Sequence, residues 1–156
     1  MRLPEIDHAI EVCERHLEHT KAFGSEIEIY LTGYLVVFIC SIFEDRIESL
    51  VNDRANKSAD SFLASFVRSA MDQLFRSLKT SELVGLFHRF GAEHGKRFRI
   101  ELKKNERAET FFNNLVLKRH DTAHKAGSDL TFSEVVQFYS EGHMVLDAVV
   151  SVLAGT

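Results

Sequence analysis

Apolar residues recur at intervals of three and four along most of this chain, a spacing typical of helices that bury one face. The longest such run lies between residues 25 and 51, and its apolar positions are Ile27, Leu31, Tyr34, Leu35, Phe38, Ile42, Ile47 and Val51. Its opening letters, EIEIYL, also alternate as a strand would, but the length and the continuing period favour a helix buried on more than one side. One proline and eight glycines in 156 residues leave little material for the turns of an all-β fold. We therefore predict an all-α, up-and-down bundle of four to five main helices, in one domain covering residues 1–156.

Capping residues divide the chain into these helices. Pro4 suits the first turn of one helix, and two S/T-x-x-E capping boxes, Ser25 with Glu28 and Thr131 with Glu134, begin two others. Helix ends are expected at Gly24, Gly91 and Gly127. One helix is expected from about residue 105 to about residue 125, and a last one from residue 131. The stretches NDRANKSAD (52–60) and GAEHGKRFRIELKKNE (91–106) have the weakest patterns and are predicted as loops, the second with some local structure.

Composition narrows the classes of function. The net charge is −4, so the chain as a whole is no polycation, and any contact with nucleic acid needs a local basic patch. Cys13 and Cys40 lie among apolar residues without a paired pattern, which is typical of buried, reduced thiols in a cytosolic protein. The longest apolar run, Tyr34 to Cys40, has seven residues, whereas a membrane span needs about 20. The N-terminal stretch is too charged for a signal peptide, so we expect a cytoplasmic protein with no membrane partner.

The segment NNLVLKRHDTAHKAG (113–127) carries the candidate site, and its residues allow more than one reading. His120 and His124 are four apart and would share one face of a helix, as two zinc ligands do. A third donor is missing from the pattern, there is no H-E-x-x-H motif, and Arg119 and Lys125 would repel a cation, so we predict no metal and no other cofactor. A polar last helical turn, complementary to the negative end of the helix dipole, would account for the same residues without any site.

The run Arg119-His120-Asp121-Thr122-Ala123-His124 resembles R-x4-H with a polar residue directly after the arginine. That motif is the signature of the HEPN superfamily (higher eukaryotes and prokaryotes nucleotide-binding domains), all-α domains with the motif at the end of the penultimate long helix. The stretch YLVVFICSIFEDRIESLV (34–51) is similar to the second helix of the RiboL-PSP-like bacterial branch, in which an acidic residue follows an aromatic one, here Phe43-Glu44.

The resemblance implies a metal-independent endoribonuclease, often found in toxin–antitoxin or phage-defence systems, with RNA as substrate and an antitoxin or defence-system protein as a further partner. The chemistry suits the residue types. An imidazole, with an ordinary pKa of about 6.5, transfers protons near neutral pH. A guanidinium is a permanently charged fork that matches phosphate oxygens. The 2′-hydroxyl can then attack the adjacent phosphorus without a metal ion.

By resemblance each motif residue is assigned a role. His124 is the expected proton-transfer group and Arg119 the phosphate clamp. His120 occupies the variable polar position and orients the substrate or shares in proton transfer. Asp121 orients a histidine or accepts backbone donors. Glu44 pairs with Arg119 or is an ordinary exposed carboxylate.

Helix geometry adds a requirement. Arg119 and His124 are five residues apart, about 140° around a helix and ~7.5 Å along it. Unless the last turn distorts, one chain cannot bring both to one phosphate, and the family pairs two chains around one cleft. We therefore expect a homodimer with a two-fold interface. Some family toxins carry a tyrosine two positions after the histidine, which a partner nucleotidyltransferase modifies; here that position is Ala126, which argues against silencing by this route.

Substrate binding would use Lys118 and Lys125 beside the motif. The basic run from Lys96 to Lys104 either extends this basic patch or is a solvated loop. Phe111 and Phe112 would stack on RNA bases or, as adjacent aromatics usually do, lie in the core. Two other functions stay open: a non-catalytic HEPN module that binds RNA or a protein partner, and an unrelated helical interaction protein in which RHDTAH is only a polar helix end.

Overall fold

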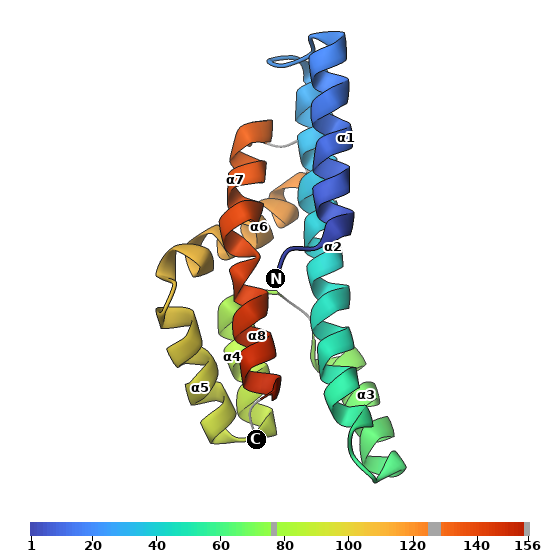
Figure 1. Cartoon of the computed structure of the whole chain (residues 1–156), viewed down its shortest axis with the longest axis vertical. Helices are drawn as coiled ribbons and strands as arrows, with labels where there is room; N and C mark the ends of the chain where they lie inside the picture. Colours follow the sequence, from blue (N-terminus) through green and yellow to red (C-terminus); the bar gives the residue numbers. More distant parts are fainter. Residues whose placement is uncertain (76–77, 125–128, 155–156) are drawn as a thin grey trace.

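The structure, a computed structural model, describes residues 1–75, 78–124 and 129–154, and of Leu74, Asp121, Ala123 and His124 the backbone alone. The described part forms eight α-helices (Figure 1). They are α1 (Pro4–Thr20), α2 (Glu26–Asn56), α3 (Ser61–Leu74), α4 (Thr80–Phe90), α5 (Ala92–Lys103), α6 (Glu106–His124), α7 (Phe132–Gly142) and α8 (Met144–Ala154). The all-α prediction is confirmed, and no strand occurs among these residues. The expected number of four to five main helices is too low.

The long helix α2 organises the bundle. At about 1.5 Å per residue its 31 residues extend over roughly 46 Å, and it contacts α1, α3, α6, α7 and α8. The rings of Phe43 and Phe112 stack at a centroid distance of 5.3 Å and join α2 to α6. Tyr139 of α7 lies 6.2 Å from Phe43 and completes this aromatic centre. All three side chains are fully buried, so the core lies where α2, α6 and α7 meet.

α6 and α7 approach each other closely at Gly142. A Cβ atom at this position would lie 3.0 Å from the backbone nitrogen of Phe112 and 3.1 Å from its Cα. Both atoms belong to the backbone, so they cannot rotate away. Beyond Gly142 the predicted last helix is interrupted at His143, and the chain continues as α8.

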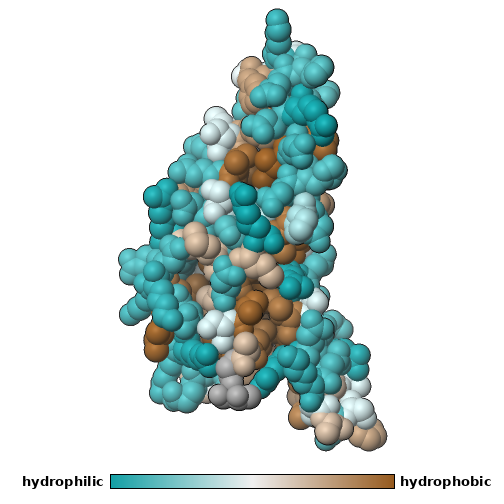
Figure 2. Space-filling model, viewed as in Figure 1, coloured by the Kyte–Doolittle hydropathy of each residue, from teal (hydrophilic) through white to brown (hydrophobic). Residues whose placement is uncertain are grey.

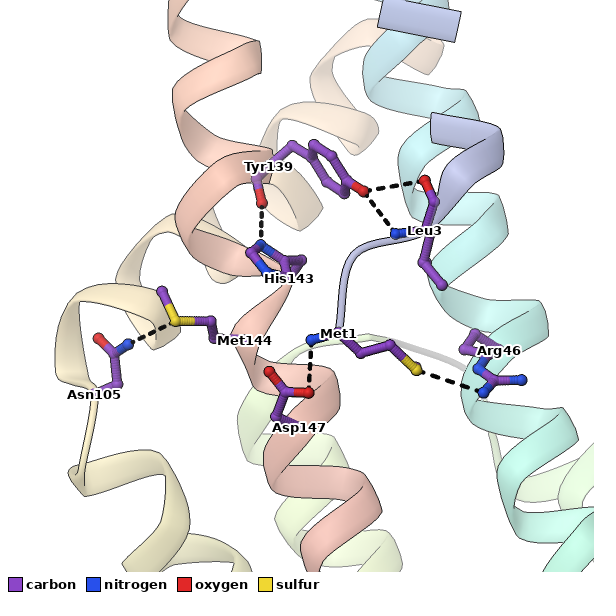
Figure 3. A network of polar contacts seen from close by, with 8 residues as sticks. All are labelled: Met1, Leu3, Arg46, Asn105, Tyr139, His143, Met144 and Asp147. Atoms are coloured by element: carbon purple, nitrogen blue, oxygen red, sulfur yellow. Dashed lines mark hydrogen bonds and ion pairs between the residues drawn. The ribbon is translucent and has the colours of Figure 1, made fainter. Parts of the chain in front are cut away.

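The N-terminal residues lie between α2 and the C-terminal pair of helices (Figure 3). The hydroxyl of Tyr139 accepts a hydrogen bond from the Leu3 backbone N–H at 2.9 Å and donates one to the Leu3 carbonyl at 3.2 Å. The Met1 ammonium lies 2.6 Å from Asp147 of α8. On the other side, the Arg46 guanidinium of α2 donates to the Met1 sulfur at 3.5 Å. This segment therefore joins α2, α7 and α8.

The predicted helix starts are confirmed at Pro4, Ser25 and Thr131, while several ends differ. Ser25 caps α2 through the Ile27 N–H, and the Thr131–Glu134 capping box is complete. α1 ends at Thr20 rather than at the expected Gly24, because Lys21 adopts the left-handed conformation, with φ of 53°. α2 continues through half of the loop predicted at 52–60. α4 does end at Gly91, and Gly127 lies outside the described residues.

The basic segment predicted as a loop is the helix α5. Its buried residues, Gly95, Phe98 and Leu102, recur at spacings of three and four, so the helical pattern is present. Six charged side chains between and around them obscure it. Here the prediction was wrong because the apolar face of α5 is only three residues long.

α2 is also, within the described ranges, the one helix long and apolar enough to cross a membrane by length and composition. It reaches a mean hydropathy of 1.7 over an 18-residue window. Counting uninterrupted apolar residues missed this, because single polar residues break the run. Nine of its residues are buried against other helices of the bundle, as in the core helix of a folded domain.

Candidate functional site

Arg119 and Glu44 form an ion pair between α6 and α2. The guanidinium donates from Nη1 to Oε1 of Glu44. The Arg119 side chain is 34% exposed and that of Glu44 27%, so the pair lies at the rim of the core, within reach of solvent. The hydrogen bond with Glu44 raises the pKa of Arg119, so the arginine remains a permanent cation. Of the two readings of Glu44, the structure has the pair with Arg119, while the roles of both residues in a reaction stay predictions.

Cys40 lies one helical turn before Glu44 on α2. Burial raises the pKa of its thiol to about 12, and the nearby Arg119 offsets only part of that effect. The thiol is therefore protonated at neutral pH and is no nucleophile. Cys13 is buried as well, and both cysteines are free, as predicted.

The remaining motif residues occupy other positions around the backbone of α6. α6 remains an α-helix through His124, so the directions of Arg119 and His124 differ by about 140° at ~100° per residue. His120 is exposed, roughly 100° around the helix from Arg119. The side chains of His124 and Asp121 lie outside the described residues, as does all of Lys125. Within one chain, the backbone of the last turn does not distort to bring the two motif residues together.

The Lys118 side chain is directed at the turn before α7 and not at Glu44. Its Nζ atom lies 3.9 Å from Asp129, a long and partly exposed ion pair. The hydrogen bonds of the Thr131 capping box lower the pKa of Glu134, and Lys118 adds to that effect. Lys118 is therefore next to the motif but is directed at the turn that follows it.

α2 also holds the chain on the far side of this turn. Glu28 accepts a hydrogen bond from the Phe132 N–H at 2.9 Å with one oxygen and from the Gly24 N–H at 2.6 Å with the other. The sequence suggested a capping role for Glu28 but gave no sign of the contact with α7. Glu44 and Glu28 thus fix the chain to α2 at the first motif residue, Arg119, and beyond the motif, at Phe132.

The basic run from Lys96 to Lys104 does not join the motif. It forms α5 and the residue after it, at the N-terminal end of α6, whereas Arg119 lies near the C-terminal end (Figure 1). From Glu106 to Arg119 the helix covers roughly 20 Å. Of the two readings of this run, a basic patch continuous with the motif is therefore not supported, and the solvated loop is instead a helix.

The adjacent aromatics of α6 serve packing. Phe112 is fully buried on Phe43, and Phe111 packs against Phe138 at a centroid distance of 5.2 Å. The Arg107 guanidinium lies 5.4 Å from the Phe111 ring. Of the two readings of these rings, the structure favours the core. Among the described residues no cluster of three His, Cys, Asp or Glu side chains has the arrangement of a metal site.

Comparison with known proteins places the chain in a family. No curated protein and no solved structure matches the chain. The family model of RiboL-PSP-HEPN matches residues 5–155, nearly the whole chain, and so includes both α2 with Glu44 and α6 with the motif. The chain belongs to the RiboL-PSP-HEPN family.

Proposed function

We propose that this protein is a HEPN-type endoribonuclease that cleaves RNA without a metal ion. One observation carries the proposal: in a chain of the RiboL-PSP-HEPN family, the motif arginine is held by the acidic residue of α2 at a solvent-accessible position. A guanidinium has five N–H donors in a rigid fork, and Glu44 accepts from Nη1. The remaining donors can bind the oxygens of a phosphate.

The reaction needs proton transfer and stabilisation of negative charge. A base removes the proton of the ribose 2′-hydroxyl, and the oxygen forms a bond to the adjacent phosphorus. The bond from phosphorus to the 5′-oxygen of the next nucleotide breaks, and this oxygen takes up a proton. The products are a 2′,3′-cyclic phosphate and a 5′-hydroxyl. His124 is the proposed proton-transfer group, with His120 assisting, and Arg119 stabilises the charge on the phosphorane oxygens.

A homodimer is part of the proposal. Because α6 is helical through His124, the two motif residues of one chain diverge, and a second chain is needed to complete the cleft. α2 offers an apolar surface for such a contact: four of its exposed side chains, spaced by three and four, form a stripe of Ile27, Tyr30, Tyr34 and Val37. Glu44 follows Val37 by seven residues, so it lies on the same side two turns further on. A symmetric contact along this stripe would bring the two Arg119–Glu44 pairs toward each other.

Cleavage of RNA in EDTA tests the proposal. The wild-type protein should produce 2′,3′-cyclic phosphate ends, and Arg119→Ala and His124→Ala should each reduce the rate by roughly 10²- to 10⁴-fold, the size of a lost acid–base or oxyanion-type contribution. Lys96→Ala is the matched control, since it removes a cation from α5 and should leave the rate unchanged. No cleavage by the wild type, or full activity of both motif variants, would refute the proposal.

A non-catalytic HEPN module that binds RNA or a protein is the second candidate. The observation in its favour is that Glu44 already neutralises Arg119. This candidate predicts tight RNA binding that Arg119→Ala weakens, with no cyclic phosphate at any pH. In either case we propose a cytoplasmic role in phage defence or as the toxin of a toxin–antitoxin pair, which growth arrest on expression of the wild type but not of His124→Ala would support.

A further inference from the structure

A cavity of about 400 Å³, lined by both polar and apolar side chains, opens beside the N-terminal end of α6, where α4 begins against α5. Its polar lining residues are Thr80, Ser81, Arg99, Lys103 and Glu109. The cavity lies outside the Arg119–Glu44 pair and takes no part in the proposed reaction.

Two cations of α5 are available at this cavity. The lysines on either side are neutralised: Lys96 of α5 lies 2.8 Å from Glu93, and Lys104, which follows α5, lies 2.7 Å from Glu101. Arg99 and Lys103, four residues apart, share one face of the helix and line the cavity. Neither has an ion-pair partner within the ranges that the structure describes. The edge of the molecule formed by α5 is largely hydrophilic (Figure 2).

The one carboxylate of the cavity is already engaged. Glu109 accepts a hydrogen bond from the Thr80 hydroxyl at 2.7 Å. Asn113 accepts one from the Thr80 N–H at 3.1 Å and donates one to the Thr80 hydroxyl at 2.9 Å. Thr80 is 3% exposed, so this network is the closed floor of the cavity. The positive side chains and the exposed Ser81 hydroxyl remain free to contact an anion at the opening.

The cavity floor and His120 share one side of α6. His120 follows Asn113 by seven residues, which places both on the same face of the helix, two turns or about 10 Å apart. A strand that reaches His120 can therefore run along α6 and pass the opening between α4 and α5.

We propose that Arg99 and Lys103 bind a phosphate of the RNA backbone at a position removed from the cleaved linkage, so that α6 carries one strand past two sites. This inference rests on the proposed ribonuclease function and extends it to the path of the substrate. Such a contact carries no sequence information; it positions the strand and adds affinity for longer RNA.

The test compares two double variants that each remove two positive charges from the same basic segment. Arg99→Ala with Lys103→Ala removes the cavity cations, and Lys96→Ala with Lys104→Ala removes the paired lysines. Binding is measured by fluorescence anisotropy with a mixed-sequence RNA oligonucleotide of 2′-O-methyl nucleotides, which cannot be cleaved through the 2′ position. The cavity variant should bind about tenfold more weakly, the size of one lost charge-assisted hydrogen bond. Its slope of log K against log salt should fall by roughly one, because one phosphate contact is lost.

The control variant should bind nearly as the wild type does, and both should cleave a dinucleotide at the wild-type rate, because a dinucleotide does not reach the cavity. Equal weakening by the two double variants, or no weakening by the cavity variant, would overturn the inference while leaving metal-free cleavage untouched. A wild type that binds RNA but never cuts it would refute the proposed function, and the comparison of the two double variants would still decide on the cavity.

Discussion

The Arg119–Glu44 pair gives a prediction in which stability and RNA affinity change in opposite directions. Glu44→Gln removes the charge that faces Arg119 but keeps an oxygen that can accept its hydrogen bond. Losing one partner of a fully buried pair costs about 3–5 kcal/mol, whereas an exposed pair contributes roughly 0–1 kcal/mol. With 34% and 27% of the two side chains exposed, the free energy of unfolding should fall by about 1–2 kcal/mol.

RNA affinity should respond differently. In the proposed phosphate clamp, the Glu44 carboxylate leaves guanidinium donors free but offsets the positive charge that attracts a phosphate, and Glu44→Gln removes this offset. RNA should therefore bind more tightly, by up to about tenfold for each 1.4 kcal/mol of released interaction. Arg119→Ala should also destabilise the fold, but it removes the proposed phosphate clamp and should weaken binding. The two variants thus agree in the sign of the stability change and differ in the sign of the affinity change.

The assays are urea unfolding followed by circular dichroism, and titration with the 2′-O-methyl RNA oligonucleotide. Asp45→Asn is the matched control: it removes one carboxylate from the next residue of α2, which is exposed. It should leave the stability within about 0.5 kcal/mol of the wild type. If Glu44→Gln binds RNA as weakly as Arg119→Ala, Glu44 orients the clamp and its charge does not oppose the phosphate. If it behaves as Asp45→Asn does, the pair has no energetic role.

Three further predictions concern the fold. Burial raises the pKa of the Cys40 thiol from 9.0 to about 12, so on raising the pH the thiol ionises first in the unfolded chain. The contribution of Cys40 to the free energy of unfolding should therefore be constant below pH 9.0 and fall as the pH rises toward 12. In Cys40→Ala, urea unfolding should show a flatter decline over this range. Gly142→Ala should lower the free energy of unfolding by about 1–2 kcal/mol, because the added Cβ meets the backbone of Phe112. Gly85→Ala adds a Cβ in open space and should raise the free energy of unfolding by roughly 0.5–1 kcal/mol. Equal changes of the two variants in thermal unfolding would contradict this. Tyr139→Phe leaves the buried Leu3 N–H without its partner and should cost about 1–3 kcal/mol, with early hydrogen exchange at Leu3 as the second readout.

Local signals predicted most of the helices. The Thr131–Glu134 box and the S-x-x-E run at Ser25 depend on residues within one turn, so the sequence contains all the information that the cap needs. The inward positions of α6, including Phe112, also follow from period alone. Where the apolar face is short, as in α5, charged residues outnumber the apolar ones that mark the helical period, and the helix was predicted as a loop.

Contacts between distant segments were beyond the sequence. The break between α7 and α8 follows Gly142, whose packing against Phe112 involves residues 30 positions apart. The network of Thr80, Asn113 and Glu109 likewise joins two helices, and no local motif marks it. For the site, the motif and its acidic partner were found through family resemblance, because the period of α6 says only that Arg119 could reach α2. The distribution of the basic side chains over the surface could not be predicted, because it depends on how the helices are arranged in space.

The close approach of α7 to α6 at Gly142 gives α6 a fixed point near Phe112, about which its C-terminal part could rotate. The backbones of α6 and α7 meet at Phe112, and Arg119 lies seven residues further, about 10 Å along the axis. Turning α6 by about 10° around this pivot would displace the guanidinium by roughly 2 Å, and a misplacement of about 1 Å can already cost ~100-fold in rate. In the proposed ribonuclease, the packing of α7 on α6 at Gly142 would therefore determine how accurately Arg119 is positioned for the phosphate, although Gly142 is remote from the substrate.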